Sequence, residues 1–166
     1  MTTPAPIPAE AQAFRNGMSL LGAAVNLITT DGPAGRHGLT ASAVCSVTDT
    51  PPTLLVCINR NAFAHDAFLR NAALCVNVLG EEHQALSLSF ARYTGEDRFA
   101  PQDWKVEATG APVLKSATAA FDCRIADVQT RGTHSVFFCE VQATSVKDQA
   151  SALLWFGRGF HTLKAG

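Results

Sequence analysis

The sequence predicts a mainly β protein, built as a closed or Greek-key antiparallel β-barrel with a few short helices. About seven short runs rich in β-branched and aromatic residues recur along the 166 residues, as strands do. Turns rich in Gly and Pro separate several of these runs, and only two or three stretches have helical spacing. A Rossmann fold fits less well, because no GxGxxG follows a strand and helices do not alternate regularly with strands.

The first part of the chain is expected to form one helix and three strands. Phe14, Met18 and Leu21 are spaced by four and three residues, which predicts a short amphipathic helix over 9–21. The three predicted strands cover 23–30, 39–48 and 53–59. A turn rich in Gly and Pro separates the first two, and a pair of prolines ends the second. The third, TLLVCIN, is almost continuously apolar, which predicts a strand covered on both faces.

The rest of the chain continues the β pattern around two further helices. One helix is predicted over 63–71, with Phe63, Ala67 and either Leu69 or Phe68 facing inward. The remaining expected elements are a strand at 74–79, a helix at 81–92, a polar loop at 93–104, long strands at 120–128 and 135–146, and short strands at 152–156 and 159–163. The first long strand alternates apolar with polar residues, which predicts one buried and one solvated face. The RGTH link between the two long strands predicts a hairpin.

The composition indicates one domain and argues against two classes of partner. Hydrophobic residues make up 47% of the chain and charged residues only 16%, so a partner subunit is expected to cover part of the apolar surplus. The formal net charge of −1 and the scattered basic residues favour neither nucleic acid nor an anionic membrane surface. No apolar run is long enough to span a bilayer. Residues 1–11 are expected to be a flexible tail without signal-peptide features, followed by one domain over 12–166.

The cysteines favour a reducing, cytoplasmic setting. Their number is odd and no two form a CxxC pair, so the sequence suggests neither a disulfide framework nor a zinc site. The five are Cys45, Cys57, Cys75, Cys123 and Cys139. Each lies among apolar residues, where a free cysteine behaves as a small hydrophobic side chain.

No familiar catalytic motif appears in the chain. The sequence has no GxSxG elbow, no phosphate-binding P-loop and no HxH or HExxH metal pattern, so neither a catalytic acid–base group nor a metal is expected. The kind of function that remains is cofactor chemistry, in which the protein supplies a mostly uncharged binding slot and the cofactor carries out the reaction. The small residues from Thr40 to Ser46 suit such a slot, because they allow a flat ring to approach the backbone. Thr40, Ser42 and Ser46 alternate, so their hydroxyls are expected to share one strand face. From periodicity alone, plain strand packing is the favoured interpretation.

Several ordered motifs resemble those of a known family. They are GLTASAVCSVTDTPPTLLVCINRNA (38–62), LCVNVL (74–79), SFAR (89–92), FDCRI (121–125), GTHSVFFCEV (132–141) and LLWFGRGFHTL (153–163). Together they are similar to the short-chain flavin reductases, the reductase components of two-component flavin monooxygenases, which have the FMN-binding split-barrel fold. The resemblance is greatest to the reductase partners of 4-hydroxyphenylacetate monooxygenase and of the pyrimidine-degrading monooxygenase. It covers roughly residues 12–163.

The resemblance implies a flavin site along the segment of small residues. The implied contacts are Thr40, Ala41, Ser42 and Ala43 at the ring, Cys45 and Ser46 toward the ribityl and phosphate end, Asn61, Ala62 and Phe63 in a phosphate-binding turn, and Phe90 and Arg92 of SFAR. Backbone amides of the turn are expected to cradle the phosphate. Arg92 is either an anion ligand or an ordinary surface arginine. His65 lies within reach of that phosphate, although a solvent-exposed helix histidine is the favoured interpretation.

The resemblance also implies a site for the nicotinamide nucleotide. His134 of the GTH motif would bind that nucleotide, Phe160 would stack, and Arg158 or His161 would add polar contacts. Many family members have Asp where this chain has Thr133, so any role of that acid is absent here. Trp155 is expected in the core.

The implied function is transfer of hydride from NADH or NADPH to FMN or FAD, which requires ring alignment rather than a catalytic side chain. Reduced flavin would then diffuse to a monooxygenase, and the reductase would be a homodimer. Two alternatives remain open at this point. One is a split-barrel flavoprotein that holds FMN tightly and reduces another acceptor. The other is a non-catalytic flavin- or haem-binding protein.

Overall fold

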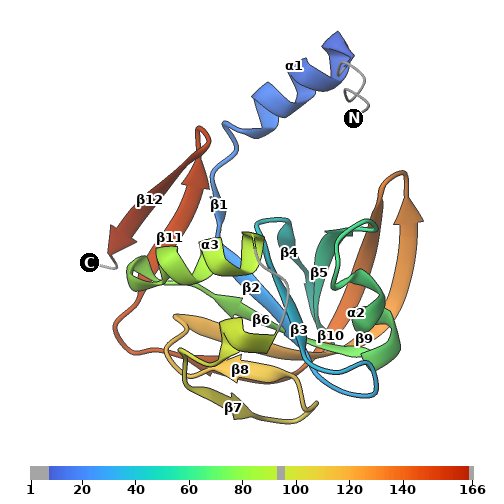
Figure 1. Cartoon of the computed structure of the whole chain (residues 1–166), viewed down its shortest axis with the longest axis vertical. Coiled ribbons are helices and arrows are strands. Elements are labelled where there is room, and N and C mark those ends of the chain that lie inside the picture. The colour runs from blue at the N-terminus through green and yellow to red at the C-terminus, as the bar shows by residue number, and fades with distance from the viewer. Residues whose placement is uncertain (1–7, 93–95, 165–166) are drawn as a thin grey trace.

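The computed structural model describes residues 8–92 and 96–164, and the protein is mainly β, as predicted. Its largest sheet has seven strands in the order β3-β2-β6-β9-β10-β5-β4, and every pairing is antiparallel. The strands are β2 (Asn26–Thr30), β3 (His37–Ala41), β4 (Val44–Asp49), β5 (Pro52–Asn59), β6 (Ala73–Val78), β9 (Ala119–Arg131) and β10 (His134–Val146). Figure 1 shows this sheet curling around a central core.

The smaller elements pack at the margins of the curled sheet. A three-stranded sheet has the order β1-β11-β12, and β7 pairs with β8. These strands are β1 (Ala23–Ala24), β11 (Ser151–Phe156), β12 (Gly159–Lys164), β7 (Trp104–Val106) and β8 (Pro112–Leu114). The helices are α1 (Ala9–Met18), α2 (His65–Asn71), α3 (Gln84–Arg92) and the 3-10 turns η1 (Glu81–His83) and η2 (Glu96–Phe99). Strands β7 and β8 are not expected from the sequence, since the predicted polar loop over 93–104 ends where β7 begins and no strand is predicted over 105–119.

The two edge strands of the large sheet, β3 and β4, are consecutive in the chain and meet at a corner formed by Ser42 and Ala43. The Ala43 carbonyl accepts a hydrogen bond from the Cys57 amide at 3.0 Å. No ladder pairs β3 with β4 among residues 8–92 and 96–164, so the barrel stays split along that seam. The single strand predicted over 39–48 is therefore wrong. The chain leaves its pairing with β2 and begins pairing with β5, so it must break between the two.

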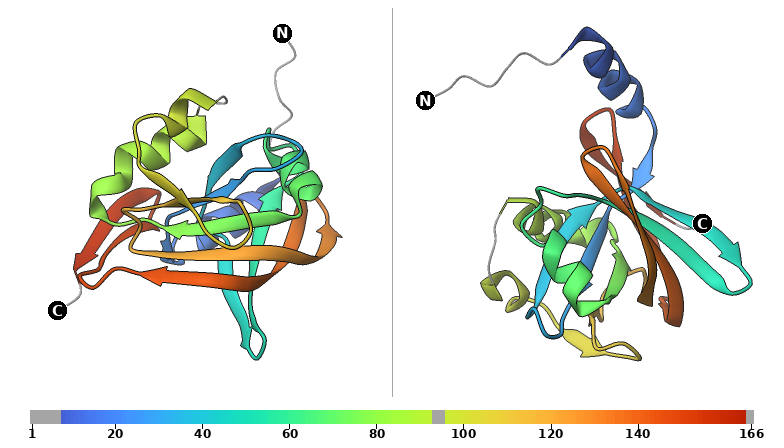
Figure 2. Two further views of the ribbon diagram at one scale, coloured as in Figure 1. Left: turned by 90° about the horizontal axis from the view of Figure 1, so that it is seen from below. Right: turned by 90° about the vertical axis from the view of Figure 1, so that its right-hand side faces the viewer.

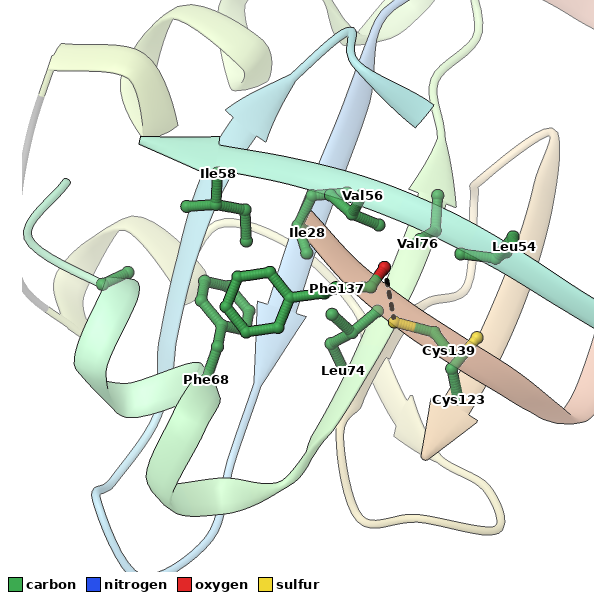
Figure 3. Packing of buried hydrophobic residues seen from close by; sticks show 11 residues of the cluster. Ile28, Leu54, Val56, Ile58, Phe68, Leu74, Val76, Cys123, Phe137 and Cys139 are labelled. Carbon is green, nitrogen blue, oxygen red and sulfur yellow. Dashed lines mark hydrogen bonds between the residues drawn. The ribbon is translucent and has the colours of Figure 1, made fainter. Parts of the chain in front are cut away.

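The main core fills the curled sheet with side chains from alternating strand positions. On β5, Leu54, Val56 and Ile58 are buried, while the intervening residues are only partly covered. Phe68 of α2 meets Phe137 of β10 edge-on, with ring centroids 6.3 Å apart (Figure 3). Strand β5 thus has one core face and one half-open face within this chain. The predicted coverage of both faces is not reached here.

Two packing predictions, one at helix α2 and one at β9, are wrong, and helix α1 is shorter than predicted. Helix α2 begins at His65, so Phe63 precedes it and is 65% exposed, while Ala67 and Phe68 supply the buried face. Helix α1 ends at Met18, three residues short of the predicted limit, and buries none of its residues. Asp122, on the expected polar face of β9, is fully buried, because its carboxylate accepts hydrogen bonds from the amide and hydroxyl of Thr109.

His83 anchors η1 and makes the stability of the fold depend on pH. The Gly80 amide donates to Nδ1 of His83 at 3.0 Å, so Nε2 carries the proton and donates to Ser116 Oγ at 2.9 Å. Burial lowers the pKa of His83 below its ordinary value. The unfolded chain therefore takes up a proton more readily than the folded one, and protonation of Nδ1 breaks the bond to Gly80.

We expect the free energy of unfolding to fall as the pH drops through about 6.5, the ordinary histidine pKa, and to be fully retained above it. Urea unfolding at a series of pH values measures this dependence. In the His83→Gln variant, the amide oxygen of the new side chain still accepts from Gly80 and does not titrate. Its curve should therefore be flatter between pH 5 and 7, and an unchanged slope would contradict the assignment.

Candidate functional site

A surface groove runs along the segment Thr40–Ala43. One part, of about 400 Å³, extends toward Asn59 and His134. The other part, of about 230 Å³, extends toward Trp155 and Phe160. The two parts share Thr40, Ala41, Ser42 and Ala91. The structure thus brings the predicted ring-contacting residues together with His134 at one end and Phe160 at the other.

The floor of the groove is fixed by hydrogen bonds to its backbone and to Thr40. Asn26 is buried beneath it, and its side-chain amide donates to the Ala41 carbonyl at 3.2 Å. The Thr40 hydroxyl donates to the Ser87 carbonyl at 2.6 Å, which ties β3 to α3. The expected common face of hydroxyls is therefore wrong, because Thr40 is engaged within the fold and Ser46 lies beyond the corner. Ser42 and Ala43 are exposed and present small side chains to the groove.

His134 begins β10 directly after the two-residue turn Gly132–Thr133, and the predicted hairpin is confirmed. Gly132 has a φ of 54°, which a glycine adopts without strain. His134 pairs with Asn59 of β5, and both line the groove. Nδ1 of His134 lies 2.9 Å from the Thr133 hydroxyl, a bond that sets the orientation of the ring. Thr133 thus contacts the ring from the middle position of the GTH motif.

The predicted phosphate turn is placed differently from the expectation. Asn61 lines a separate polar pocket of about 540 Å³, together with Arg60 and His65. The Asn61 amide donates to the Asn59 side chain at 2.9 Å, and the Ala62 amide donates to the Asn59 carbonyl, so both are used within the turn. These two amides therefore have partners within the turn, and the phosphate cradle over Asn61–Phe63 stays a prediction.

The side chains around this turn also differ from the sequence-based picture. Ala62 lines the groove, whereas Phe63 points outward and meets the ring of His37 at 5.6 Å between centroids. His65 is 5% exposed, so its interpretation as a solvent-exposed helix histidine is wrong. It bonds to Ser135 and Asp66 instead.

Of the two SFAR candidates, only Phe90 lines the groove. Phe90 is buried and meets Phe99 edge-on, with ring centroids 4.9 Å apart. Arg92 is exposed at the end of α3 and lines neither part of the groove. Arg98, which the sequence analysis missed, lies over the Phe90 ring at 4.6 Å and donates to the Gly38 carbonyl at 2.8 Å. Burial lowers the pKa of its guanidinium. No motif marks Arg98, since it falls in the predicted polar loop.

A third and larger cavity, of about 1080 Å³, lies between α1 and the half-open face of β5. Cys45 lines this cavity from β4. Arg158, in the turn between β11 and β12, also lines it, and its Nη2 donates to the side chain of Asn16 in α1 at 2.6 Å. Ser46 is exposed next to Cys45 and lines none of the described pockets. The structure does not bring Cys45 and Ser46 together with Asn61, because they pair with the opposite half of β5.

The aromatic wall of the groove comes from the β11–β12 hairpin. Trp155 and Phe160 face each other across it, with ring centroids 5.0 Å apart. Trp155 is 36% exposed and lines the groove, so its placement in the core is wrong. His161 lies on the same hairpin but bonds to the Phe156 carbonyl and lines none of the described pockets.

Three further observations concern the cysteines, the possible metal ligands and the helices of the described residues. All five cysteines are free, and burial raises the pKa of Cys139 to about 12. Nowhere in 8–92 and 96–164 do three His, Cys, Asp or Glu side chains gather as a metal site would require. None of the helices in these ranges has the length and apolar character needed to cross a bilayer. The small side chains and the aromatic wall of the groove themselves suit an organic ligand with a flat ring.

Comparison with known proteins agrees with this geometry. Residues 18–164 match the model of the flavin reductase like domain. The FMN reductase (NADH) RutF of Variovorax paradoxus is 56% identical over 153 residues, covering 92% of this chain and 85% of the relative. A solved structure of a flavin reductase from Haemophilus somnus superposes with a TM-score of 0.89 at 41% identity, covering 95% of this chain and all of the other.

A nitrilotriacetate monooxygenase component B homologue from Mycobacterium thermoresistibile superposes with a TM-score of 0.84 at 26% identity. That match covers 93% of this chain and 87% of the other. A family match over most of the chain and a relative at more than half identity lead to the same conclusion. The chain belongs to the flavin reductase like domain family.

Proposed function

We propose that this protein is an NADH-dependent flavin reductase that binds FMN in the groove along Thr40–Ala43. The observation that carries the proposal is the groove itself. Its floor of small side chains lies between His134 and the aromatic wall of Trp155 and Phe160. A floor of this kind lets a flat ring lie against the backbone. FMN and NADH are named because the Variovorax relative is an FMN reductase (NADH). FAD and NADPH are the competing choices for the test below.

The mechanism needs alignment rather than an acid or a base. Bound in the groove, the nicotinamide nucleotide would supply a hydride to the flavin ring. The residues of this chain hold the two rings: Ala41, Ser42 and Ala43 support one face, and Phe160 limits movement at the far end. His134, oriented by Thr133, donates or accepts a hydrogen bond at the mouth. Such positioning supplies most of the rate in a step without a catalytic side chain.

A homodimer is part of the proposal, because α1 buries none of its residues against the rest of the described chain. Phe14 is 68% exposed, and Leu20 and Leu21 just beyond the helix are exposed to a similar degree. Figure 2 shows α1 standing apart from the sheets. A second copy seated on α1 and on the cavity beside β5 would bury these side chains. The mass in solution, measured by light scattering, tests this point.

The wider setting follows from the free cysteines and the family. Reduced flavin would leave the groove, which holds it with few charged contacts, and would reach a separate monooxygenase component. The Mycobacterium neighbour is a component of a monooxygenase system. Five free thiols suit a reducing compartment, the cytoplasm. We propose that residues 12–166 form the flavin reductase domain. Of the predicted tail over 1–11, residues 1–7 lie outside the described ranges, and residues 9–11 belong to α1.

One assay tests the function against its alternatives. Purified protein is mixed with NADH and excess FMN, and NADH loss is followed at 340 nm. We expect oxidation that depends on added FMN, with lower efficiency for FAD and NADPH. An absence of NADH oxidation would favour a non-catalytic binding protein. Oxidation that ignores added flavin would favour a tightly bound flavin and another acceptor.

A further inference from the structure

Two hydrogen bonds between a histidine Nε2 and a serine hydroxyl lie in different parts of the fold, and they run in opposite directions. His65 Nε2 meets Ser135 Oγ at 2.9 Å, and His83 Nε2 meets Ser116 Oγ at 2.9 Å. Both histidines are buried, at 5% and 3% exposure. The second pair holds η1, away from the groove. The first pair joins α2 to β10 directly beside His134.

The orientation of the first bond follows from the partner on the other ring nitrogen. His65 Nδ1 lies 2.9 Å from a carboxylate oxygen of Asp66, which only accepts hydrogen bonds. Nδ1 therefore carries the proton, and Nε2 accepts the bond from the Ser135 hydroxyl. Ser135 is 3% exposed and points to the interior, because successive side chains of a strand face opposite sides. Its neighbour His134 consequently points to the groove.

Beyond the β5–β10 ladder, which pairs His134 with Asn59, two further hydrogen bonds hold the end of the β9–β10 hairpin to the β5–α2 segment. The Arg60 amide donates to the Thr133 carbonyl at 2.9 Å, and Ser135 donates to His65. The last residues of β9 are largely exposed, so little packing holds this end. Figure 1 shows the hairpin rising beside α2, away from the main body of the sheet. His134 lies between the two links.

We propose that His65, acting through Ser135, is a positioning residue that fixes His134 for the nicotinamide nucleotide. The proposal rests on the proposed function, since it assigns His134 to the NADH side of the groove. His65 touches neither ring, and its effect passes through the backbone of β10. Loss of the link should therefore weaken NADH use and leave FMN binding unchanged.

The experiment compares two serine-to-alanine variants that each delete one hydroxyl from a buried histidine. We expect Ser135→Ala to raise the KM for NADH about threefold to fivefold, the factor of one neutral hydrogen bond. Its kcat and its FMN Kd, from fluorescence titration, should stay within about 1.5-fold. The matched control, Ser116→Ala, should keep the KM for NADH, the kcat and the FMN Kd within about 1.5-fold of the wild-type values. Both variants should lower the Tm by a similar amount, because each loses one buried hydrogen bond.

Rescue variants keep the test sharp. Ser135→Thr restores a hydroxyl, and His65→Gln restores a polar atom near the place of Nε2, so both should return the KM to within about twofold. If Ser135→Ala does not fold, the KM of these two is compared with that of His65→Leu, which should match the value expected for Ser135→Ala.

Equal KM changes in Ser135→Ala and Ser116→Ala would overturn the positioning role, as would no change in either. If the wild-type protein oxidises no NADH, the proposed function falls and this inference with it. If His134→Ala raises KM but Ser135→Ala does not, only the positioning role is lost.

Discussion

Replacement of Ser42 by Trp is expected to weaken FMN binding by about 100-fold or more, equivalent to about 2.8 kcal/mol. Ser42 lies at the corner between β3 and β4 and lines both parts of the groove. It is exposed and outside the strand ladders, so a large side chain meets solvent rather than the core. An indole there would occupy the space above the backbone floor that a flat ring needs. The substitution should therefore lower the affinity for FMN and leave the stability of the fold unchanged.

The measurement is an FMN fluorescence titration, accompanied by thermal unfolding of the same variant. Thr144→Trp is the matched control, because Thr144 is exposed on β10 and lines none of the described pockets. Aromatic residues suit exposed strand positions, so the control should fold and bind FMN normally. The groove would be wrongly placed if Ser42→Trp bound FMN as tightly as the control.

Replacement of His134 by Ala is expected to lower kcat/KM for NADH about tenfold, the loss of one good hydrogen bond at about 1.4 kcal/mol. His134 is exposed at the end of the groove opposite Phe160, and the Thr133 hydroxyl orients its ring. The Ala variant loses a polar group at the mouth without disturbing the floor at Ala41–Ala43. The FMN Kd should thus stay within about twofold.

Steady-state kinetics with NADH as the varied substrate measure this effect. His161→Ala serves as the control, since His161 is an exposed histidine on β12 that lines none of the described pockets. A collapse of flavin affinity in His134→Ala, with NADH use otherwise unchanged, would place His134 on the flavin and not on the nicotinamide nucleotide.

The regular elements were readable in the sequence because their signals are local. The period of two in 120–128 and the Gly-containing turn before His134 led to β9, β10 and their hairpin. The pattern did not reveal that Asp122 is buried. That depends on Thr109, which reaches its carboxylate from a loop thirteen positions earlier. Strands β7 and β8 were missed because each is only three residues long, too short to show an alternating pattern.

In the candidate site, too, some features are local to the sequence and others depend on the fold. The small side chains of Ala41, Ser42 and Ala43 and the motif around His134 are properties of the sequence, and the family resemblance joined them. The sequence also suggested phosphate ligation by the amides at Asn61 and Ala62, which the fold uses within its own turn. A backbone amide carries no label in the sequence, so only its observed partner shows whether it is available.

By itself, the sequence determined that this chain forms a β-rich domain of a flavin reductase family. It also showed that the side chains of the segment Thr40–Ser46 are too small to fill a core. The tertiary structure decided what that segment adjoins. The curl of the sheet, which brings its two edges to the corner at Ser42–Ala43, places β3 beside α3, His134 and the β11–β12 hairpin. It also carries Cys45 and Ser46 past the corner and turns His65 inward onto Ser135. The alternation of a strand depends on neighbouring residues, whereas these contacts between distant segments depend on how the strands pair around the barrel.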